Sequence, residues 1–396
     1  MTISNVINFG SALQTYATVK LIKKAGFFCK IINFDYPSQW HSENCQGFEN
    51  QSSKTRRVLR ILAAKIGILN AYRNLRKRVH FRKKQRQEIV TAMVFRNFLN
   101  SIGLTEKVYD RNTILQDPPA ADIYITGSDQ TWNPRYLHTD YSFLLNFAPQ
   151  DAPKISYAAS FGASELFPKY KEAYSKYLKR YDRISVRESS GVTLVKELCG
   201  KDAVHVLDPT LMLDADEWST LNTNKIALPE KFIFCYILDY VFSPGPALKK
   251  LIDHLSEITG LPVITCPEVY SYPQGRSFSE EIGPDGFIEC FAKATFVVTT
   301  SFHGSAFSVN FKKDFFAVLN PNSTKDDRVR NFLSSVKLEH RGLLLPETDV
   351  SKITLADLKT DYTESSVCLE NMRKNSWAYL KEALDYSARK CNGEVQ

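Results

Sequence analysis

The sequence predicts an α/β protein made of two doubly wound, Rossmann-like domains that face each other across a cleft. Short apolar segments of strand length alternate with segments of helical periodicity along most of the chain, a pattern typical of parallel sheets covered on both faces. A polar stretch at residues 213–229 interrupts this alternation, which then begins again. We therefore expect a first domain at 1–222 and a second at 223–396, which ends in a C-terminal helix.

The expected strands and helices alternate in both domains. In the first domain, strands are expected at 28–34, 123–126, 154–160, 183–187 and 203–207, with helices at 11–25 and 188–198. In the second domain, strands are expected at 232–238, 262–265, 296–299 and 315–319, with helices at 246–259, 287–294 and 305–311. Ligands of open α/β sheets bind outside the carboxyl ends of the strands, so functional residues are expected in the loops that follow them.

The composition excludes several protein classes. The chain has 396 residues, of which 43% are hydrophobic, so it is long enough for two or three domains with cores of their own. Its longest apolar runs, such as 232–238, are far shorter than the ~20 residues of a membrane-spanning helix. The first eight residues lack the regions of a signal peptide, which favours a cytoplasmic location. Eight cysteines without a Cys-x-x-Cys pair favour reduced thiols and no metal site.

A strongly basic segment lies inside the first domain. Residues 51–87 contain 13 Lys and Arg residues and no acidic residue, which more than accounts for the net charge of +8. Apolar residues recur there at helical steps, which predicts a basic helical insertion at about 51–90 with an apolar stripe along 56–79. The stripe packs against its own domain or, alternatively, attaches the protein to an anionic membrane surface on the inner leaflet. No nucleic-acid-binding motif accompanies the charge, so nucleic acid is not an expected partner.

Two candidate binding loops lie in the first domain before residue 135. Gly10 and Ser11 form a glycine turn at a helix N-terminus, which attracts an anion, although an ordinary serine-capped turn is the alternative. After the strand at 123–126, Asp129 is followed by Trp132. A carboxylate beside an aromatic ring is typical of a sugar site, in which the ring stacks on the sugar. The alternative is that Asp129 only binds the backbone of its own turn.

Two further loops carry charged or titratable groups. Arg187 ends the strand at 183–187, where a guanidinium forks onto a phosphate or carboxylate; an ion pair with Glu188 is the alternative. After the strand at 296–299, Ser301, His303 and Gly304 form the turn into the next helix. A histidine pKa of about 6.5 permits proton transfer near neutrality. A histidine with a purely structural role is the alternative.

Taken in order, these clusters resemble the polysaccharide pyruvyl transferase family. The motifs are N-F-G-S-A-L-Q-x-Y-A, I-T-G-S-D-Q-x-W-N-P, S-V-R-E-x-S-G, L-D-P-T-L and S-F-H-G-S-A-F-S, from about residue 8 to 341. The resemblance implies a fold similar to GT-B glycosyltransferases. It also implies transfer of pyruvate from phosphoenolpyruvate to a pair of sugar hydroxyls as a ketal, with Asp129, Arg187 and His303 at the donor. Several members carry an Arg where this chain has Ser301, and we expect Arg328 or Arg330 to replace it.

These residues suggest a mechanism without a cofactor or a metal. His303, as the imidazolium, is the expected general acid that protonates the donor, and Asp129 orients or deprotonates the attacking hydroxyl. Arg187 and a second-domain Arg hold the donor's anionic groups. The expected acceptor is a hexose of a cell-surface polysaccharide precursor, in lipid-linked form. The alternatives are a nucleotide-sugar glycosyltransferase in the same two-domain cleft and a non-catalytic glycan-binding relative.

Overall fold

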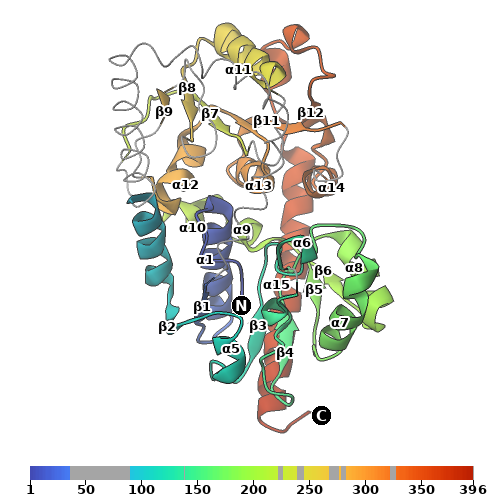
Figure 1. Ribbon diagram of the computed structural model, residues 1–396. Coiled ribbons are helices and arrows are strands. Elements are labelled where there is room, and N and C mark those ends of the chain that lie inside the picture. The colour runs from blue at the N-terminus through green and yellow to red at the C-terminus, as the bar shows by residue number, and fades with distance from the viewer. Residues whose placement is uncertain are drawn as a thin grey trace, which may run out of the picture.

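The chain folds into two α/β lobes joined at one side by a long helix (Figure 1). The computed structural model describes residues 1–35, 90–137, 139–221, 226–238, 245–266, 276–277, 282–321 and 327–395. The basic segment 51–87, with its expected helix at 56–79, lies outside these residues, so the membrane surface predicted for it remains a prediction.

The second lobe is built on a sheet of six parallel strands among the described residues. In the order of the sheet they are β9 (Arg276–Ser277), β8 (Val263–Thr265), β7 (Ile233–Tyr236), β10 (Phe296–Thr299), β11 (Asp314–Leu319) and β12 (Gly342–Leu344). Every neighbouring pair is parallel. Numbered along the chain, this is the 3-2-1-4-5-6 order of a Rossmann fold.

Helices cover both faces of this sheet. Ile233 and Cys235 of β7 belong to a buried cluster with residues of α11 (Pro246–Thr259), whereas Phe234 and Tyr236 pack with α12 (Pro284–Lys293) and α13 (Phe302–Asn310). Successive side chains of a strand point to opposite faces, so a strand that is apolar at every position is buried on both. The helix α14 (Asp327–Ser335) packs in the same buried cluster as α12 and α13. The predicted doubly wound architecture is therefore confirmed.

The first lobe contains shorter parallel strands. The strand β1 (Ile31–Phe34) pairs with β2 (Leu104–Tyr109), and β3 (Tyr124–Thr126) pairs with β4 (Lys154–Ser156). The strands β5 (Ser185–Val186) and β6 (Val204–His205) form a third parallel pair, and isolated bridges join β4 and its following loop to the segment around β5. The helices among the described residues of this lobe are α1 (Phe9–Lys24), α5 (Thr113–Gln116), α6 (Pro134–Leu137), α7 (Pro168–Leu178), α8 (Ser189–Cys199), α9 (Pro209–Met212), α10 (Ala215–Ser219) and the helical residues 90–102.

The strand β2 is absent from the sequence-based prediction. Glu106, Lys107 and Val108, in the middle of this strand, are exposed, so the segment lacks the apolar run that marks a buried strand. It pairs with β1, a strand that is buried at every position. An exposed strand of this kind depends on its partner rather than on its own composition, which is why its pattern is weak.

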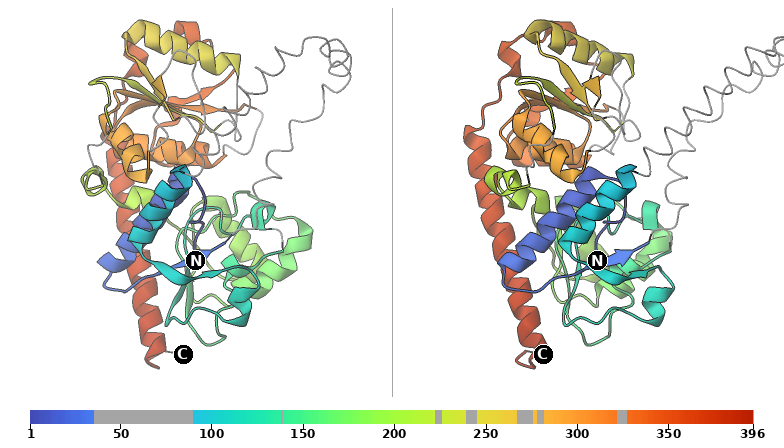
Figure 2. Two further views of the ribbon diagram at one scale, coloured as in Figure 1. Left: turned by 60° about the vertical axis from the view of Figure 1, so that its left-hand side comes forward. Right: turned by 90° about the vertical axis from the view of Figure 1, so that its left-hand side faces the viewer.

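The helix α1 lies where the two lobes meet. Figure 2 shows it side by side with the helical residues 90–102, and Phe9 packs on Phe95 of that helix with ring centroids 4.9 Å apart. Phe9 also stacks on Phe287 of α12 in the second lobe, at 4.4 Å and nearly parallel. One aromatic side chain of α1 therefore contacts both lobes, and this contact places the helix N-terminus next to α13.

The C-terminal helix α15 (Thr363–Cys391) returns to the first lobe. The Tyr379 hydroxyl donates a 2.9 Å hydrogen bond to the carbonyl of Ser156 in β4, and the Ser376 hydroxyl accepts from the amide of Leu207. In Figures 1 and 2 this red helix runs along both lobes. The expected second domain therefore includes a helix whose second half packs on the first. No helix among the described residues has the length and apolarity needed to cross a bilayer.

Candidate active site

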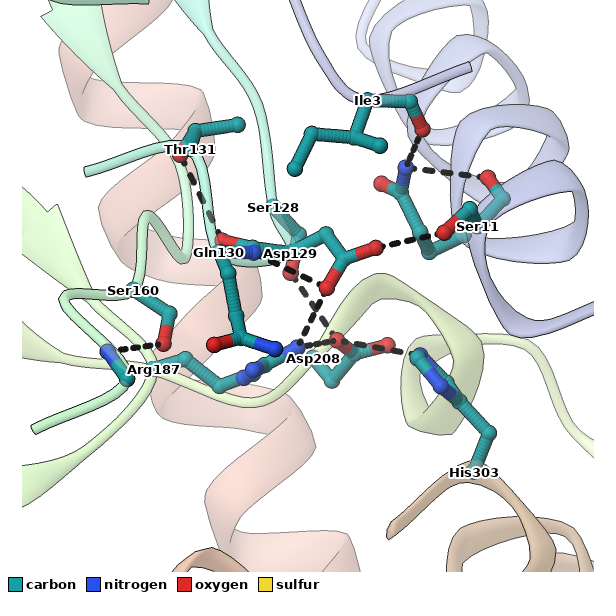
Figure 3. A network of polar contacts seen from close by, with 12 residues as sticks. Ile3, Ser11, Ser128, Asp129, Gln130, Thr131, Ser160, Arg187, Asp208 and His303 are labelled. Carbon is teal, nitrogen blue, oxygen red and sulfur yellow. Dashed lines mark hydrogen bonds and ion pairs between the residues drawn. The ribbon is translucent and has the colours of Figure 1, made fainter. Parts of the chain in front are cut away.

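Polar side chains from both lobes converge at the carboxyl ends of the parallel strands. Asp129 follows β3, Arg187 follows β5, Asp208 follows β6, and His303 lies in the first turn of α13 after β10. Figure 3 shows Asp208 between the guanidinium of Arg187 and the imidazole of His303. The structure thus brings together Asp129, Arg187 and His303, the three residues singled out by the sequence, and adds a fourth that the prediction omits.

Asp129 is held in a strained turn by hydrogen bonds from Ser11 and Gln130. Its φ of 73° lies in the left-handed region, which residues other than glycine rarely adopt. The Ser11 hydroxyl at the start of α1 donates a 2.6 Å hydrogen bond to Asp129 Oδ2, and the amide of Gln130 donates to Oδ1. Oδ1 also lies 4.0 Å from Nη1 of Arg187. The carboxylate is therefore fixed in position, with one face toward the guanidinium.

Arg187 is buried among carboxylates. Its Nε donates to Glu188 Oε1 at 2.9 Å and its Nη1 donates to Asp208 Oδ2 at 3.1 Å, while the guanidinium lies over the ring of Phe302 at 4.8 Å. Burial alone would lower the pKa of Arg187, but the carboxylates of Glu188, Asp208 and Asp129 outweigh it and raise the pKa. Nη2 is buried and has no hydrogen-bond partner. A permanently charged donor atom is thus available to a ligand.

His303 is also buried with an unpartnered nitrogen. Its Nε2 makes no hydrogen bond and lies 3.9 Å from Asp208 Oδ2. Burial is the main cause that lowers the pKa of His303 from its ordinary value, and Arg187 and Arg328 lower it further, although Asp208 and Asp129 oppose them. At neutral pH the imidazole is therefore mostly uncharged in the ligand-free site, whereas the sequence-based mechanism assigned it as an imidazolium.

Asp208 is the residue of this network that sequence reasoning missed. Its Oδ1 accepts hydrogen bonds from the amide and hydroxyl of Thr210 at 2.9 and 2.7 Å, which caps α9. Its Oδ2 accepts from Ser128 Oγ at 2.9 Å and from Arg187. The available signal was the motif L-D-P-T-L, in which an acid stands before a proline at the end of a strand. That pattern predicts a helix cap, which uses only one carboxylate oxygen. It gives no indication of what the second oxygen contacts.

A cavity of about 340 Å³ adjoins this network between the two lobes. Arg187, Asp208 and His205 line it from the first lobe, and Phe302 and Arg328 line it from the second. The guanidinium of Arg330 instead donates a 2.9 Å hydrogen bond to the carbonyl of Asn320. Of the two arginines expected to replace the missing one at Ser301, Arg328 is the one that faces the cavity.

Trp132 does not form a sugar platform, which corrects the prediction for this residue. Its side chain is fully buried, and its indole Nε1 donates to the carbonyl of Phe143 at 3.2 Å. Its ring packs on Phe161 and Tyr181 in the core of the first lobe. A large aromatic side chain close to a functional carboxylate in sequence can point to the opposite face of the turn, and here the turn at Asp129 directs Trp132 inward.

Of the other predicted binding residues, some lie against the site residues and others only support the packing of the fold. A Cβ atom on Gly10 would overlap Nδ1 of His303, so this glycine lets α1 approach the imidazole. A Cβ on Gly304 would overlap Oγ1 of Thr299, so that glycine serves helix packing instead. Ser301 is the N-cap residue of α13 but caps no amide with its side chain. The first-turn amides of α13 therefore lack a side-chain cap beside His303. Among the described residues, no group of three or more His, Cys, Asp or Glu is placed to hold a metal ion.

Comparison with known proteins finds one family and two similar solved structures. A model of the family described as polysaccharide pyruvyl transferase matches residues 8–322. The chain is similar to the UDP-GlcNAc 2-epimerase from Methanocaldococcus jannaschii, with a TM-score of 0.43, 9% identity, and coverage of 67% of this chain and 85% of that one. It is similar to a putative UDP-N-acetylglucosamine 2-epimerase from Listeria monocytogenes, with a TM-score of 0.43, 12% identity, and coverage of 73% and 80%. Comparison with the curated proteins finds no match.

The family match spans most of the chain and contains all four converging residues. It includes Asp129, Arg187 and Asp208 in the first lobe and His303 in the second. The resemblance carried by the five ordered motifs is thereby confirmed. The chain belongs to the polysaccharide pyruvyl transferase family, transferases of polysaccharide biosynthesis.

Proposed function

We propose that the protein transfers the pyruvyl group of phosphoenolpyruvate to two hydroxyls of a hexose in a polysaccharide precursor and forms a cyclic ketal. One observation carries this proposal: Nη2 of Arg187 is buried without a hydrogen-bond partner, at an interlobe cavity that Arg328 also lines. A buried polar atom without a partner is costly unless a ligand satisfies it. A small anionic donor that accepts hydrogen bonds meets this requirement.

The donor has a carboxylate and a phosphate, and the cavity offers two guanidinium groups for them. Arg187 contributes from the first lobe and Arg328 from the second, so one bound molecule would link the lobes. Each guanidinium forms charge-assisted hydrogen bonds to such groups, and the uncapped amides of α13 favour negative charge nearby. In this assignment, Arg328 supplies the positive charge that other family members place at the position of Ser301.

The chemistry balances without an added cofactor. A proton joins C3 of the donor, which becomes a methyl group, while the oxygen of one sugar hydroxyl bonds to C2. The bond between C2 and the phosphate oxygen then breaks, and the oxygen of a neighbouring hydroxyl bonds to C2. The two hydroxyl protons replace the proton given to C3 and protonate the departing phosphate. The products are a ketal and inorganic phosphate.

His303 is the proposed acid and Asp129 the proposed residue that orients or deprotonates the attacking hydroxyl. The imidazole is mostly neutral without ligand, because burial lowers the pKa of His303. The donor brings negative charge next to the ring, and a nearby opposite charge raises the pKa of a histidine. Binding of the correct donor thus prepares the acid that the reaction needs. General acid catalysis of this kind contributes about 10²–10⁴-fold.

The proposed acceptor is a lipid-linked glycan at the cytoplasmic face of the membrane. The basic segment 51–87, which lies outside the described residues, carries 13 Lys and Arg residues and no acid. Such a segment is attracted to anionic lipids by about 1 kcal/mol per basic residue near the surface. Attachment of a cytoplasmic enzyme to that leaflet would bring the site to its acceptor.

The experiment supplies phosphoenolpyruvate together with a panel of free and lipid-linked glycans. The expected result is release of phosphate with a glycan mass increase of one pyruvyl ketal. His303→Asn should abolish both signals. His254→Asn serves as the matched control, because His254 bonds the carbonyl of Ile353 on the far side of the second lobe. Turnover with nucleotide sugars instead of phosphoenolpyruvate, or binding of glycans without turnover of any donor, would overturn the proposal.

A further inference from the structure

Asp208 has more hydrogen bonds than a helix cap requires. Its Oδ1 alone satisfies the cap, through the amide and hydroxyl of Thr210. Its Oδ2 accepts from Ser128 and Arg187 in the first lobe and faces His303 of the second lobe at 3.9 Å. An asparagine caps a helix about as well as an aspartate does. The cap therefore does not explain why a charged residue stands in this buried position.

Four charged groups face the imidazole of His303. Asp208 and Asp129 are negative and come from the loops after β6 and β3, whereas Arg187 and Arg328 are positive and come from the end of β5 and from α14. In α1, the backbone of Gly10 lies beside Nδ1. Of the two carboxylates, Asp208 is the one with an oxygen within 4 Å of Nε2, and that nitrogen makes no hydrogen bond.

We propose that Asp208 is a positioning residue for His303: its Oδ2 accepts the Nε2 proton of the imidazolium across the lobe junction and holds the ring in one orientation. Shortening the contact from 3.9 Å to a hydrogen bond requires a shift of about 1 Å between α13 and the loop after β6. Nδ1 then remains beside Gly10, in the direction of α1. The inference rests on the proposed function only in taking His303 as the acid.

The charge of Asp208 also links the acid to the donor-binding arginine. Its Oδ2 is shared, since Nη1 of Arg187 donates to it at 3.1 Å. When the imidazole gains a proton, the same oxygen serves two cations. When Arg187 moves toward a bound donor, its hydrogen bond to Asp208 Oδ2 weakens. That oxygen then accepts the Nε2 proton of His303. Donor binding and protonation of the imidazole are thus coupled through one carboxylate.

The test is the titration of His303 by NMR in the protein without substrate. The chain has seven histidines, so the signal that is lost in His303→Asn assigns the resonance. Asp208→Asn keeps the cap and removes the charge, and we expect it to lower the pKa of His303 by about one unit or more. Ser128→Ala removes a competing donor from Oδ2 and should shift the titration in the opposite direction. Glu382→Gln, at an exposed ion pair, should leave it unchanged.

The titration of His303 in these variants decides whether the inference holds. If His303 titrates in Asp208→Asn as it does in the parent protein, Asp208 has only a structural role and the inference is overturned. If Asp208→Asn does not fold, Ser128→Ala decides by the same titration, and an unchanged pKa there overturns the inference. Because these measurements use no donor, they are independent of the proposed function. With phosphoenolpyruvate present, Asp208→Asn should lower kcat and move its alkaline limb to lower pH.

Discussion

The first turn of α1 lies directly against the imidazole of His303, because Gly10 has no Cβ where one would overlap Nδ1. The two residues are far apart in sequence and belong to different lobes. The adjacent residue, Ser11, donates a 2.6 Å hydrogen bond to Asp129. One turn of helix therefore positions both residues that we assign to proton transfer.

We expect Gly10→Ala to reduce kcat by about 10²-fold, because the added methyl group displaces the imidazole by the order of 1 Å. The fold should persist, since the substitution favours the helix. Lys20→Ala is the control on the same helix, at an exposed position away from the site. Steady-state kinetics together with thermal unfolding check the expectation. Normal turnover in Gly10→Ala would show that the imidazole does not need its observed position.

Donor binding should take up protons at pH 7. The pKa of His303 lies below its ordinary value in the ligand-free site, and a bound trianion raises it, so the complex holds more protons than the separate molecules. Donor affinity should therefore fall as pH rises above neutrality. Calorimetry in two buffers of different ionisation enthalpy measures the uptake. His303→Asn should remove it, and equal uptake in both proteins would assign the proton to another group.

Arg328→Ala should raise the KM for phosphoenolpyruvate about tenfold or more, because a charged hydrogen bond contributes about 1.5–3 kcal/mol. Arg330→Ala is the matched control two residues away. Its guanidinium bonds the carbonyl of Asn320, so its loss should lower stability without a change in donor KM. Donor titrations of the two variants separate the roles. An increase in donor KM of equal size in both variants, or in Arg330→Ala alone, would contradict the assignment.

Trp132→Phe should affect stability and not acceptor binding. The indole is fully buried, and its loss removes a hydrogen bond to the carbonyl of Phe143, which still accepts from Thr126. We expect a destabilisation of about 1–3 kcal/mol. Chemical denaturation and acceptor KM measure the two quantities. A raised acceptor KM at unchanged stability would restore the role as a sugar platform.

Arg187→Gln should destabilise the protein by about 3–5 kcal/mol as well as abolish turnover, because it leaves the buried Asp208 and the partly buried Glu188 without their cation. Adding Glu188→Gln removes one of these uncompensated charges and should restore part of the stability but none of the activity. Denaturant unfolding of the single and double variants tests the first effect. Recovery of turnover in the double variant would mean that Arg187 only supports the fold.

Local patterns were sufficient to locate the loops that form the site. Each of Asp129, Arg187 and His303 stands at the end of an apolar run, and such runs are recognisable because strands buried on both faces have no polar positions. The same patterns were insufficient for β2, whose exposed middle residues depend on pairing with β1. The alternation of elements predicted the class of the fold and left the partners of each strand open.

The sequence by itself determined the α/β class, the order of the motifs and the residue types available for catalysis, because these depend on periodicity and on neighbours along the chain. Only the tertiary structure decided that Trp132 belongs to the core, that Asp208 stands between Arg187 and His303, and that the imidazole is mostly neutral before a ligand binds. The direction of a side chain, its burial and its charged neighbours are set by contacts between segments that are distant in the chain. No local pattern encodes them.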